Sequence, residues 1–379
     1  MIIELRGVEF VNKGAELMLY SILSKLRKDL PEAEFAMEIS SRAPEDKLRE
    51  LNIMRKAKGR KQALLLYMMP KVLRQRLGKV LEKDVDVIMD GSGFAFGDKW
   101  GAKKAGVRLA DHITKWKSAG KKIYVLPQAL GPFSDHALSK KMRVILDNAD
   151  LVIARDHISK KFISEIKPSA KNIRLAPDFT NLVDAIHDEK YKSLDGQVAI
   201  IPNFKMVEGK AVGDRENYFE FLRKSIEIVQ KGGLQAFFLL HEGKDDEDIA
   251  LQVNTKLQVG LPIIKESHPL KVKGIIGKSR GIVSSRFHGL VSALSQGVPC
   301  VATGWSHKYE MLLEDYDFRD GLADINIDET LLKEKLKYLI NPEENTILVA
   351  KLKTRAEVLK LKSVSMWAEV IEDIRKKNV

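Results

Sequence analysis

An arginine and a histidine lie two positions apart in "GIVSSRFHGLVSALSQG", where a short apolar run precedes a helix-like pattern. If residues 283–285 end a strand and a helix follows, Arg286 and His288 lie where backbone N–H groups also point. Arginine there can bind a carboxylate or phosphate through two hydrogen bonds, and histidine can exchange a proton near neutral pH. A second interpretation stays open, in which Arg286 pairs with a structural carboxylate and His288 caps the helix.

Three glycines follow another apolar run, in "VIMDGSGFAFGD". The third comes one residue later than in the dinucleotide-binding fingerprint, so NAD binding is not expected. Gly91, Ser92 and Gly93 indicate either a tight turn or a close approach of the backbone to a sugar or phosphate. The chain has no P-loop, no G-x-S-x-G and no H-E-x-x-H, and its "KDDED" run is interpreted as a solvated helix start. We therefore expect no metal and no cofactor.

Composition limits the class of protein. The 379 residues exceed what one hydrophobic core usually holds, so two domains are expected. The charged amino terminus and the lack of a long apolar stretch predict neither a secretory signal nor a membrane span. The single cysteine, Cys300, is interpreted as a buried core thiol, which suits the cytoplasm. A net charge of +12 favours an anionic partner without specifying which.

Strand-like and helix-like patterns alternate along both halves of the chain. This alternation predicts an α/β fold of two Rossmann-like domains whose parallel sheets face a central cleft. Strands are expected within residues 1–10, 85–91, 122–128, 150–156, 172–178, 197–204, 234–242, 261–266, 281–285 and 298–304. Helices are expected at 14–30, with Pro31 just past the end, and at 214–233 with Asp214 as its cap, and one or two long helices are expected at 344–377. The predicted domains are 1–180, on the acceptor side, and 197–345, on the donor side, with helices at 346–379 returning to the first domain.

Ligands of such folds bind beyond the carboxyl ends of the strands. This rule selects residues 12–16, 90–98, 127–133, 155–156, 177–178, 284–288 and 304–308.

Six segments at these positions carry recognisable motifs. They are "NKGAELML", "DGSGFAFGDKWG", "LPQALGPF", "ARDHIS", "APDF" and "SSRFHGLVSALSQGVPCVATGWSHKYEMLLEDY". In this order they resemble the motifs of the polysaccharide pyruvyl transferase family, including its R-x-H element. The match runs from Asn12 to about Tyr316, and six ordered elements are specific where a lone R-x-H is not.

The resemblance implies a fold, an activity and a site. Relatives move the pyruvyl group of phosphoenolpyruvate to two sugar hydroxyls, forming a cyclic ketal, and resemble two-domain GT-B glycosyltransferases in fold. The implied catalytic residues are His288, Arg286 and Arg155. The implied substrate-binding residues are Asn12, Gly14, Gly91, Ser92, Gly93, Gln128, Asp178, Ser285, His307 and Lys308. The family commonly has Gly-Asp where this chain has Ala15-Glu16, which leaves the role of Glu16 open.

The implied chemistry begins with protonation of the methylene carbon of phosphoenolpyruvate. We assign His288 as the acid, Arg286 and Arg155 as donor-binding cations, and His307 and Lys308 to the departing phosphate. A nucleotide-sugar glycosyltransferase of the same fold is the alternative. A nucleic-acid-binding module is not favoured, because the basic segment 55–81 has one aromatic residue and no recognised binding motif.

The segment 55–81 has nine basic residues and no acidic one. A helix there is expected to place Leu73, Leu77 and Val80 on one face and Arg74, Arg76 and Lys79 on another, after a break at Pro70. It is interpreted either as a contact with the anionic inner face of the membrane, suited to a lipid-linked acceptor, or as a solvated basic face. The acceptor sugar, the ketal stereochemistry and the oligomeric state stay open.

Overall fold

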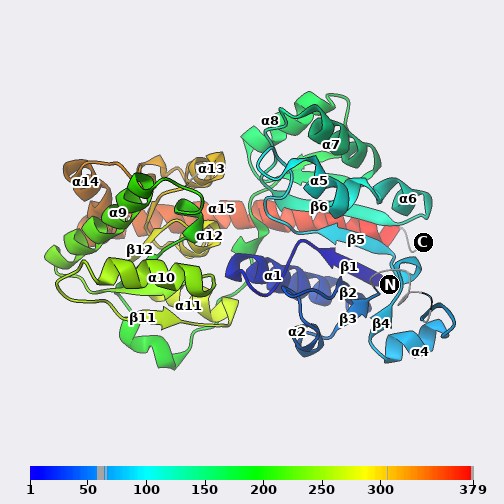
Figure 1. Cartoon of the computed structure of the whole chain (residues 1–379), viewed down its shortest axis with the longest axis horizontal. Helices are drawn as coiled ribbons and strands as arrows, with labels where there is room; N and C mark the ends of the chain where they lie inside the picture. The colour runs from blue at the N-terminus through cyan, green and yellow to red at the C-terminus, as the bar shows by residue number, and fades with distance from the viewer. Residues whose placement is uncertain (58–63, 65, 305, 377–379) are drawn as a thin grey trace. The chain divides into compact units, whose positions relative to one another are not determined.

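The computed structural model describes residues 1–57, 64, 66–304 and 306–376 (Figure 1). Contacts divide the chain into two compact units. Unit 1 holds Met1–Val11, Met18–Phe179 and Ser363–Val379, and unit 2 holds Asn12–Leu17 and Thr180–Lys362. Residues 1–180 were expected to form one domain, but Asn12–Leu17 group with unit 2, where Asn12 bonds Glu242 and the N–H of Lys13 bonds the carbonyl of His241.

Unit 1 is built on a sheet of eight strands in the order β4-β3-β2-β1-β5-β6-β7-β8. Neighbouring strands all run parallel. The strands are Ile2–Arg6 (β1), Glu34–Glu38 (β2), Ile53–Lys56 (β3), Lys79–Val80 (β4), Val87–Asp90 (β5), Lys122–Gln128 (β6), Leu151–Ala154 (β7) and Ile173–Leu175 (β8). Side chains of β5 such as Ile88 pack with the helical Trp116 and Ile145 in one apolar core, which explains the uninterrupted apolar runs.

Helices surround this sheet, as the alternation of patterns predicts. They are α1 (Lys13–Asp29), α2 (Glu45–Glu50), α4 (Lys71–Arg76), η1 (Glu82–Asp84), α5 (Gly101–Ala105), the π-helical η2 (Gly106–Ala110), α6 (Ile113–Ser118), α7 (His136–Asn148), α8 (His157–Ile166) and η3 (Phe179–Asn181). Asp135 and Asp156 start α7 and α8 by accepting hydrogen bonds from backbone N–H groups of the first turn.

Unit 2 has a parallel sheet of five strands in the order β11-β10-β9-β12-β13. They are Val198–Ile201 (β9), Ala236–Leu240 (β10), Ile263–Lys265 (β11), Gly281–Ser284 (β12) and Cys300–Ala302 (β13). Val198 and Ile200 belong to the core on one face of this sheet, and Ala199 and Ile201 to the core on the other. Both faces are therefore covered, as expected for a Rossmann-like unit.

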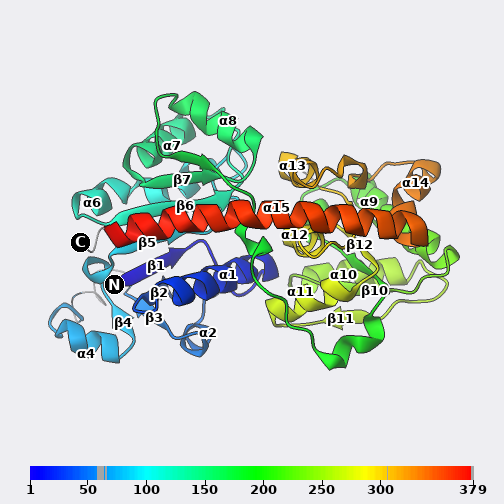
Figure 2. The same cartoon turned by 180° about the vertical axis from the view of Figure 1, so that it is seen from behind.

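The helices of unit 2 follow the same alternation. They are η4 (Glu189–Leu194), η5 (Phe204–Met206), α9 (Val212–Lys231), α10 (Gly243–Asn254), α11 (Pro269–Lys278), α12 (Phe287–Leu294), α13 (His307–Asp315), η6 (Arg319–Gly321), α14 (Glu329–Ile340) and α15 (Pro342–Arg375). Figure 2 shows α15 as one continuous helix. Its residues from Ser363 onward belong to unit 1, where Trp367 packs edge-to-face on Phe179 and Asp373 accepts a hydrogen bond from Tyr124 at 2.7 Å.

Several details differ from the sequence-based expectation. Strands β2, β3 and β4 were not predicted. Asp214 does not cap α9, because the helix begins two residues earlier, with Ala211 at its N-cap, and Asp214 lies in its first turn. Cys300 is fully buried and burial raises the pKa of its thiol, which confirms a core role. Among the described residues, every helix is too short or too polar to cross a bilayer.

The basic segment 55–81 is not the amphipathic helix that we expected. Helix α4 starts after Pro70, as predicted, but ends at Arg76, because Gly78 adopts a left-handed conformation and the chain continues into β4. Arg74 is buried and bonds both oxygens of Asp84 at 2.8 Å. Neither Arg74 nor the buried Val80 can face a membrane. Residues 58–63 and 65 of the segment lie outside the described residues.

Candidate functional site

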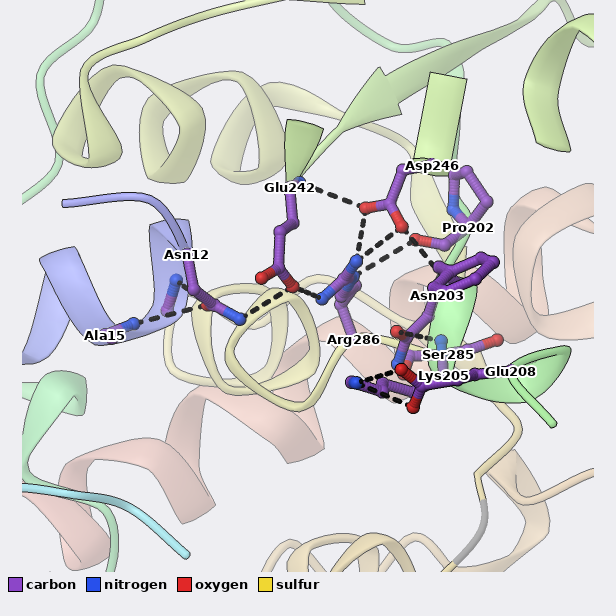
Figure 3. Close-up of polar contacts among 12 residues, drawn as sticks. Asn12, Ala15, Pro202, Asn203, Lys205, Glu208, Glu242, Asp246, Ser285 and Arg286 are labelled. Carbon is purple, nitrogen blue, oxygen red and sulfur yellow. Dashed lines mark hydrogen bonds and ion pairs between the residues drawn. The ribbon is translucent and has the colours of Figure 1, made fainter. Parts of the chain in front are cut away.

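Arg286 lies at the N-cap of α12, directly after β12, as the strand and helix patterns predict. Its side chain is almost fully buried, and all three guanidinium nitrogens donate hydrogen bonds within unit 2 (Figure 3). One terminal nitrogen bonds Glu242, the other bonds both oxygens of Asp246, and Nε bonds the carbonyl of Pro202 at 3.3 Å. The pairing with carboxylates is that of the second interpretation given above.

The two carboxylates that hold Arg286 differ in exposure. The Asp246 side chain is completely buried and also accepts hydrogen bonds from the backbone N–H groups of Phe204 and Glu242, at 2.9 and 3.0 Å. Burial raises the pKa of Asp246, and Arg286 opposes that rise. The Glu242 side chain remains 24% exposed. The acidic run "KDDED" does begin a helix, α10, but Asp246 is not solvated, which corrects our interpretation: it is the structural partner of Arg286.

Two residues of the amino-terminal motif contact this site. We define the unit 2 cluster as Asn12, Gly14, His241, Glu242, Asp246, Arg286 and His288. Asn12 starts α1 by accepting a hydrogen bond from the backbone N–H of Gly14 at 2.8 Å, and its amide donates to Glu242 at 2.9 Å. Gly14 lies directly against His288, since a Cβ added at Gly14 would be 2.4 Å from Nδ1 of that imidazole. The structure thus brings together, within unit 2, four predicted site residues from two distant parts of the sequence, namely Asn12, Gly14, Arg286 and His288.

Ser285 supports the turn that carries Arg286. It is buried, its hydroxyl lies 2.9 Å from the hydroxyl of Tyr218, and its carbonyl accepts hydrogen bonds from Asn203 and Tyr309. These bonds fix the backbone between β12 and α12 from three sides, so Ser285 acts on the position of Arg286 through the main chain.

His307 and Lys308 begin α13 and are half-buried. The ammonium group of Lys308 lies 5.4 Å from the ring centre of Phe287 and 5.2 Å from that of Tyr309. Cation–π contacts of this kind hold the lysine beside the first turn of α12. Both residues therefore belong to the same end of the unit 2 sheet as Arg286.

Unit 1 assembles the other predicted residues at the carboxyl ends of its strands. Arg155, after β7, pairs with Asp178 at 2.9 Å, and both side chains are buried. The Gln128 amide donates to Asp90 at 3.1 Å, and the carbonyl of Gln128 accepts from the N–H of Arg155. Arg155 and Arg286 lie in different units, so their joint action on one donor stays a prediction.

The glycine-rich turn after β5 has the geometry of a tight turn. Gly93 has a φ of +70°, and the backbone N–H of Ser92 bonds the side chain of Asp90 at 3.1 Å. A Cβ added at Gly91 would lie 3.0 Å from Ile22 and 3.1 Å from Val8, which is a tight fit. The structure accounts for these three residues through the backbone, and contact with a sugar or phosphate stays a prediction.

Sequence reasoning missed three residues of the unit 2 cluster. His241, Glu242 and Asp246 follow strand β10, and applying the strand-end rule to that strand would have selected the first two. His241 is fully buried, and burial together with Arg286 and His288 keeps its pKa well below the ordinary value. A neutral imidazole is thus expected beside the cationic groups. Asp246 could not be selected from the sequence, because the acidic run "KDDED" that contains it resembles an exposed helix start.

A sequence model of the polysaccharide pyruvyl transferase family matches residues 12–307, which include every residue of this cluster. The chain belongs to this family. The match confirms the resemblance found in the motifs. The comparison with curated proteins gives no match.

Solved structures similar to this family member share its fold at low identity. HepE of Anabaena in complex with UDP is 13% identical, with 99% of each chain covered and a TM-score of 0.62. A putative UDP-N-acetylglucosamine 2-epimerase of Listeria monocytogenes is 12% identical over 99% of this chain and 96% of that one, with a TM-score of 0.58. The corresponding Neisseria meningitidis epimerase is 12% identical over 96% and 99%, with a TM-score of 0.55. These neighbours confirm the predicted GT-B-type fold.

Proposed function

We propose that this transferase moves the pyruvyl group of phosphoenolpyruvate to two hydroxyls of a glycan sugar, forming a cyclic ketal and releasing phosphate. The observation that carries the proposal is a convergence within unit 2 of a chain of this family: Asn12 and Arg286 both bond the Glu242 carboxylate, and Gly14, next to Asn12, lies against His288. The convergence supports a site for an anion beside a histidine.

The Glu242 carboxylate occupies the position that we propose for the carboxylate of the bound donor. Its carboxylate accepts from both Asn12 and Arg286, the two side chains best suited to a substrate carboxylate. Because Glu242 is partly exposed while Asp246 is buried, the donor is proposed to displace Glu242 and to leave the Arg286–Asp246 pair in place. Glu242 then competes with the donor for Arg286.

His288 is proposed as the acid that protonates the methylene carbon of phosphoenolpyruvate. The resulting oxocarbenium centre is attacked by one hydroxyl, which loses its proton, and departure of phosphate permits attack by the second hydroxyl. One of the two hydroxyl protons replaces the proton given to the methyl carbon, and the other leaves with phosphate. A neighbouring arginine disfavours the imidazolium, and the negative charge of the bound donor favours it, which couples protonation to donor binding.

The remaining predicted residues take supporting roles in this proposal. Arg155 binds the donor together with Arg286, and His307 and Lys308 hold the departing phosphate. The acceptor is a glycan or a lipid-linked oligosaccharide, bound on the side of unit 1. Because phosphoenolpyruvate is a cytoplasmic metabolite, the reaction is proposed to occur in the cytoplasm.

Thermal unfolding tests the donor without knowledge of the acceptor. Phosphoenolpyruvate at 100 times its Kd should stabilise the protein by about 2.7 kcal/mol, because ligand binds only the folded state. UDP-glucose at the same concentration should leave the Tm unchanged. Protection by the nucleotide sugar and none by phosphoenolpyruvate would instead support the glycosyltransferase alternative.

The reaction is proposed to need no divalent metal. Among the residues that the structure describes, no group of three or more His, Cys, Asp and Glu side chains could hold a metal ion. Arginine, lysine and helix N-termini can supply the positive charge that the donor needs. Acceptor-dependent phosphate release should therefore be the same with and without EDTA. Activity that is lost in EDTA and restored by magnesium or manganese would contradict this expectation.

Gly14→Ala should lower activity through His288. The added methyl group would overlap the imidazole at 2.4 Å, and a displacement of about 1 Å can cost about 100-fold in rate. We expect kcat to fall at least about ten-fold, with an unfolding temperature close to that of the parent. The matched control is Gly213→Ala, on the first turn of α9, where no heavy atom lies within 4 Å of the added carbon. Equal activities of the two variants would show that Gly14 does not control the placement of His288.

A further inference from the structure

An apolar surface stands out at one edge of unit 1, and we define it as the apolar lobe, residues 64 and 66–77. Six of the twenty exposed large apolar side chains among the described residues lie there, each 46–87% exposed. They are Leu64, Tyr67, Met68, Val72, Leu73 and Leu77. Such a concentration of exposed apolar side chains marks an interaction surface.

A buried ion pair anchors the apolar lobe. Arg74 is buried beneath it, bonds both oxygens of Asp84 at 2.8 Å, and donates to the carbonyls of Leu66 and Met69. Figures 1 and 2 show α4 at the periphery of the unit, next to β4, which is the last strand of the eight-stranded sheet. The buried ion pair therefore anchors the segment that carries the exposed side chains.

Cationic side chains lie within the apolar lobe and beside it in the chain. Lys71 and Arg76 are exposed, Lys79 is half-buried, and Lys83 lies 3.7 Å from the ring centre of Tyr67. Acidic side chains near this region have partners of their own: Asp84 bonds Arg74, Glu82 bonds Lys115, Glu34 accepts from Gln75, and Glu45, which lines a pocket with Arg76, pairs with Arg49 and Arg55. The surface therefore combines exposed apolar side chains with exposed cationic ones.

We propose that the apolar lobe docks this protein onto an anionic lipid surface. Apolar side chains that enter the interface, together with lysine and arginine at the headgroups, match such a surface in both polarity and charge. A second copy of the chain fits less well, because a symmetric contact would bring the cationic side chains of the two copies together. The docking does not depend on the proposed reaction, since no residue of the unit 2 cluster takes part in it.

Vesicle co-sedimentation of the full chain tests the docking. The protein should sediment with vesicles of phosphatidylcholine and phosphatidylglycerol at low salt, but not with phosphatidylcholine alone, and binding should fall as salt rises. Neutralising Lys71 and Arg76 by glutamine should weaken binding about 25-fold, at about five-fold per charge. Met68→Ser with Leu73→Ser should weaken it at least about ten-fold.

Matched controls distinguish a specific effect of the apolar lobe on vesicle binding from a general effect of removing exposed apolar or charged side chains. Val259→Ser with Leu361→Ser removes two exposed apolar side chains elsewhere, and Lys190→Gln with Lys192→Gln removes two exposed charges. Both controls should bind vesicles like the parent. The docking is overturned if the parent does not sediment at low salt or if controls and apolar lobe variants lose binding equally. It is also overturned if light scattering shows that the apolar lobe residues mediate self-association in place of vesicle binding.

Discussion

His288→Ala should reduce kcat by about 10²–10⁴-fold while changing the Kd of phosphoenolpyruvate by less than about three-fold. A positioned acid typically contributes a rate factor of this size. Its work is done in the transition state, so removing it should leave ground-state binding nearly intact. Stopped-assay phosphate release gives kcat, and the ligand dependence of thermal unfolding gives the Kd.

His187→Ala is the matched control for this variant. His187 is an exposed histidine of unit 2 outside the cluster, so its removal should change neither kcat nor Kd. Near-normal kcat in His288→Ala would show that another group protonates the donor. A loss of binding as large as the loss of rate would assign His288 to donor binding instead.

Arg286→Ala should destabilise the protein by about 3–5 kcal/mol, because it leaves the Asp246 carboxylate buried without its cation. For a unit of this size the Tm should fall by roughly 6–20 °C. Adding Asp246→Asn removes the uncompensated charge and should recover at least half of the lost stability. Differential scanning calorimetry of the parent, the single variant and the double variant measures both effects. Full stability of Arg286→Ala would contradict the role of Asp246 as a structural partner.

The same arginine should also govern donor affinity. Phosphoenolpyruvate should protect neither Arg286→Ala nor the more stable double variant, which separates binding from folding. Glu242→Gln should have the opposite effect on donor affinity. It should lower the Kd of the donor about five-fold or more, because a competing carboxylate and its repulsion of the donor are removed. Weaker donor binding in Glu242→Gln would show that Glu242 takes part in binding and does not compete.

Local patterns predicted most of the architecture. The apolar runs in residues 85–91 and 197–204 indicated strands buried on both faces, and the packing of Ile88, Val198 and Ala199 into cores shows why. The turn that places Arg286 before α12 was also predictable, because it follows from a strand ending and a helix beginning. These features depend on neighbours in sequence.

Features that depend on distant partners were not predictable from pattern. Asn12 bonds Glu242 across 230 positions, and Arg286 bonds Asp246 across 40. Nothing in "KDDED" distinguishes the buried Asp246 from its solvated neighbours until α10 is placed against Arg286. The failure over residues 71–81 has the same origin, since Arg74 looks like a surface residue until Asp84 is placed beneath it.

Product analysis in deuterated water tests the central claim most directly. The protein is incubated in ²H₂O with phosphoenolpyruvate and a panel of glycans, and the glycans are examined by mass spectrometry and NMR. We expect a cyclic pyruvate ketal whose methyl group carries one deuterium, formed with one equivalent of phosphate, because the acid that protonates the methylene carbon exchanges with solvent. A ketal methyl group without deuterium, or transfer of a sugar from a nucleotide sugar with no ketal from phosphoenolpyruvate, would contradict the account.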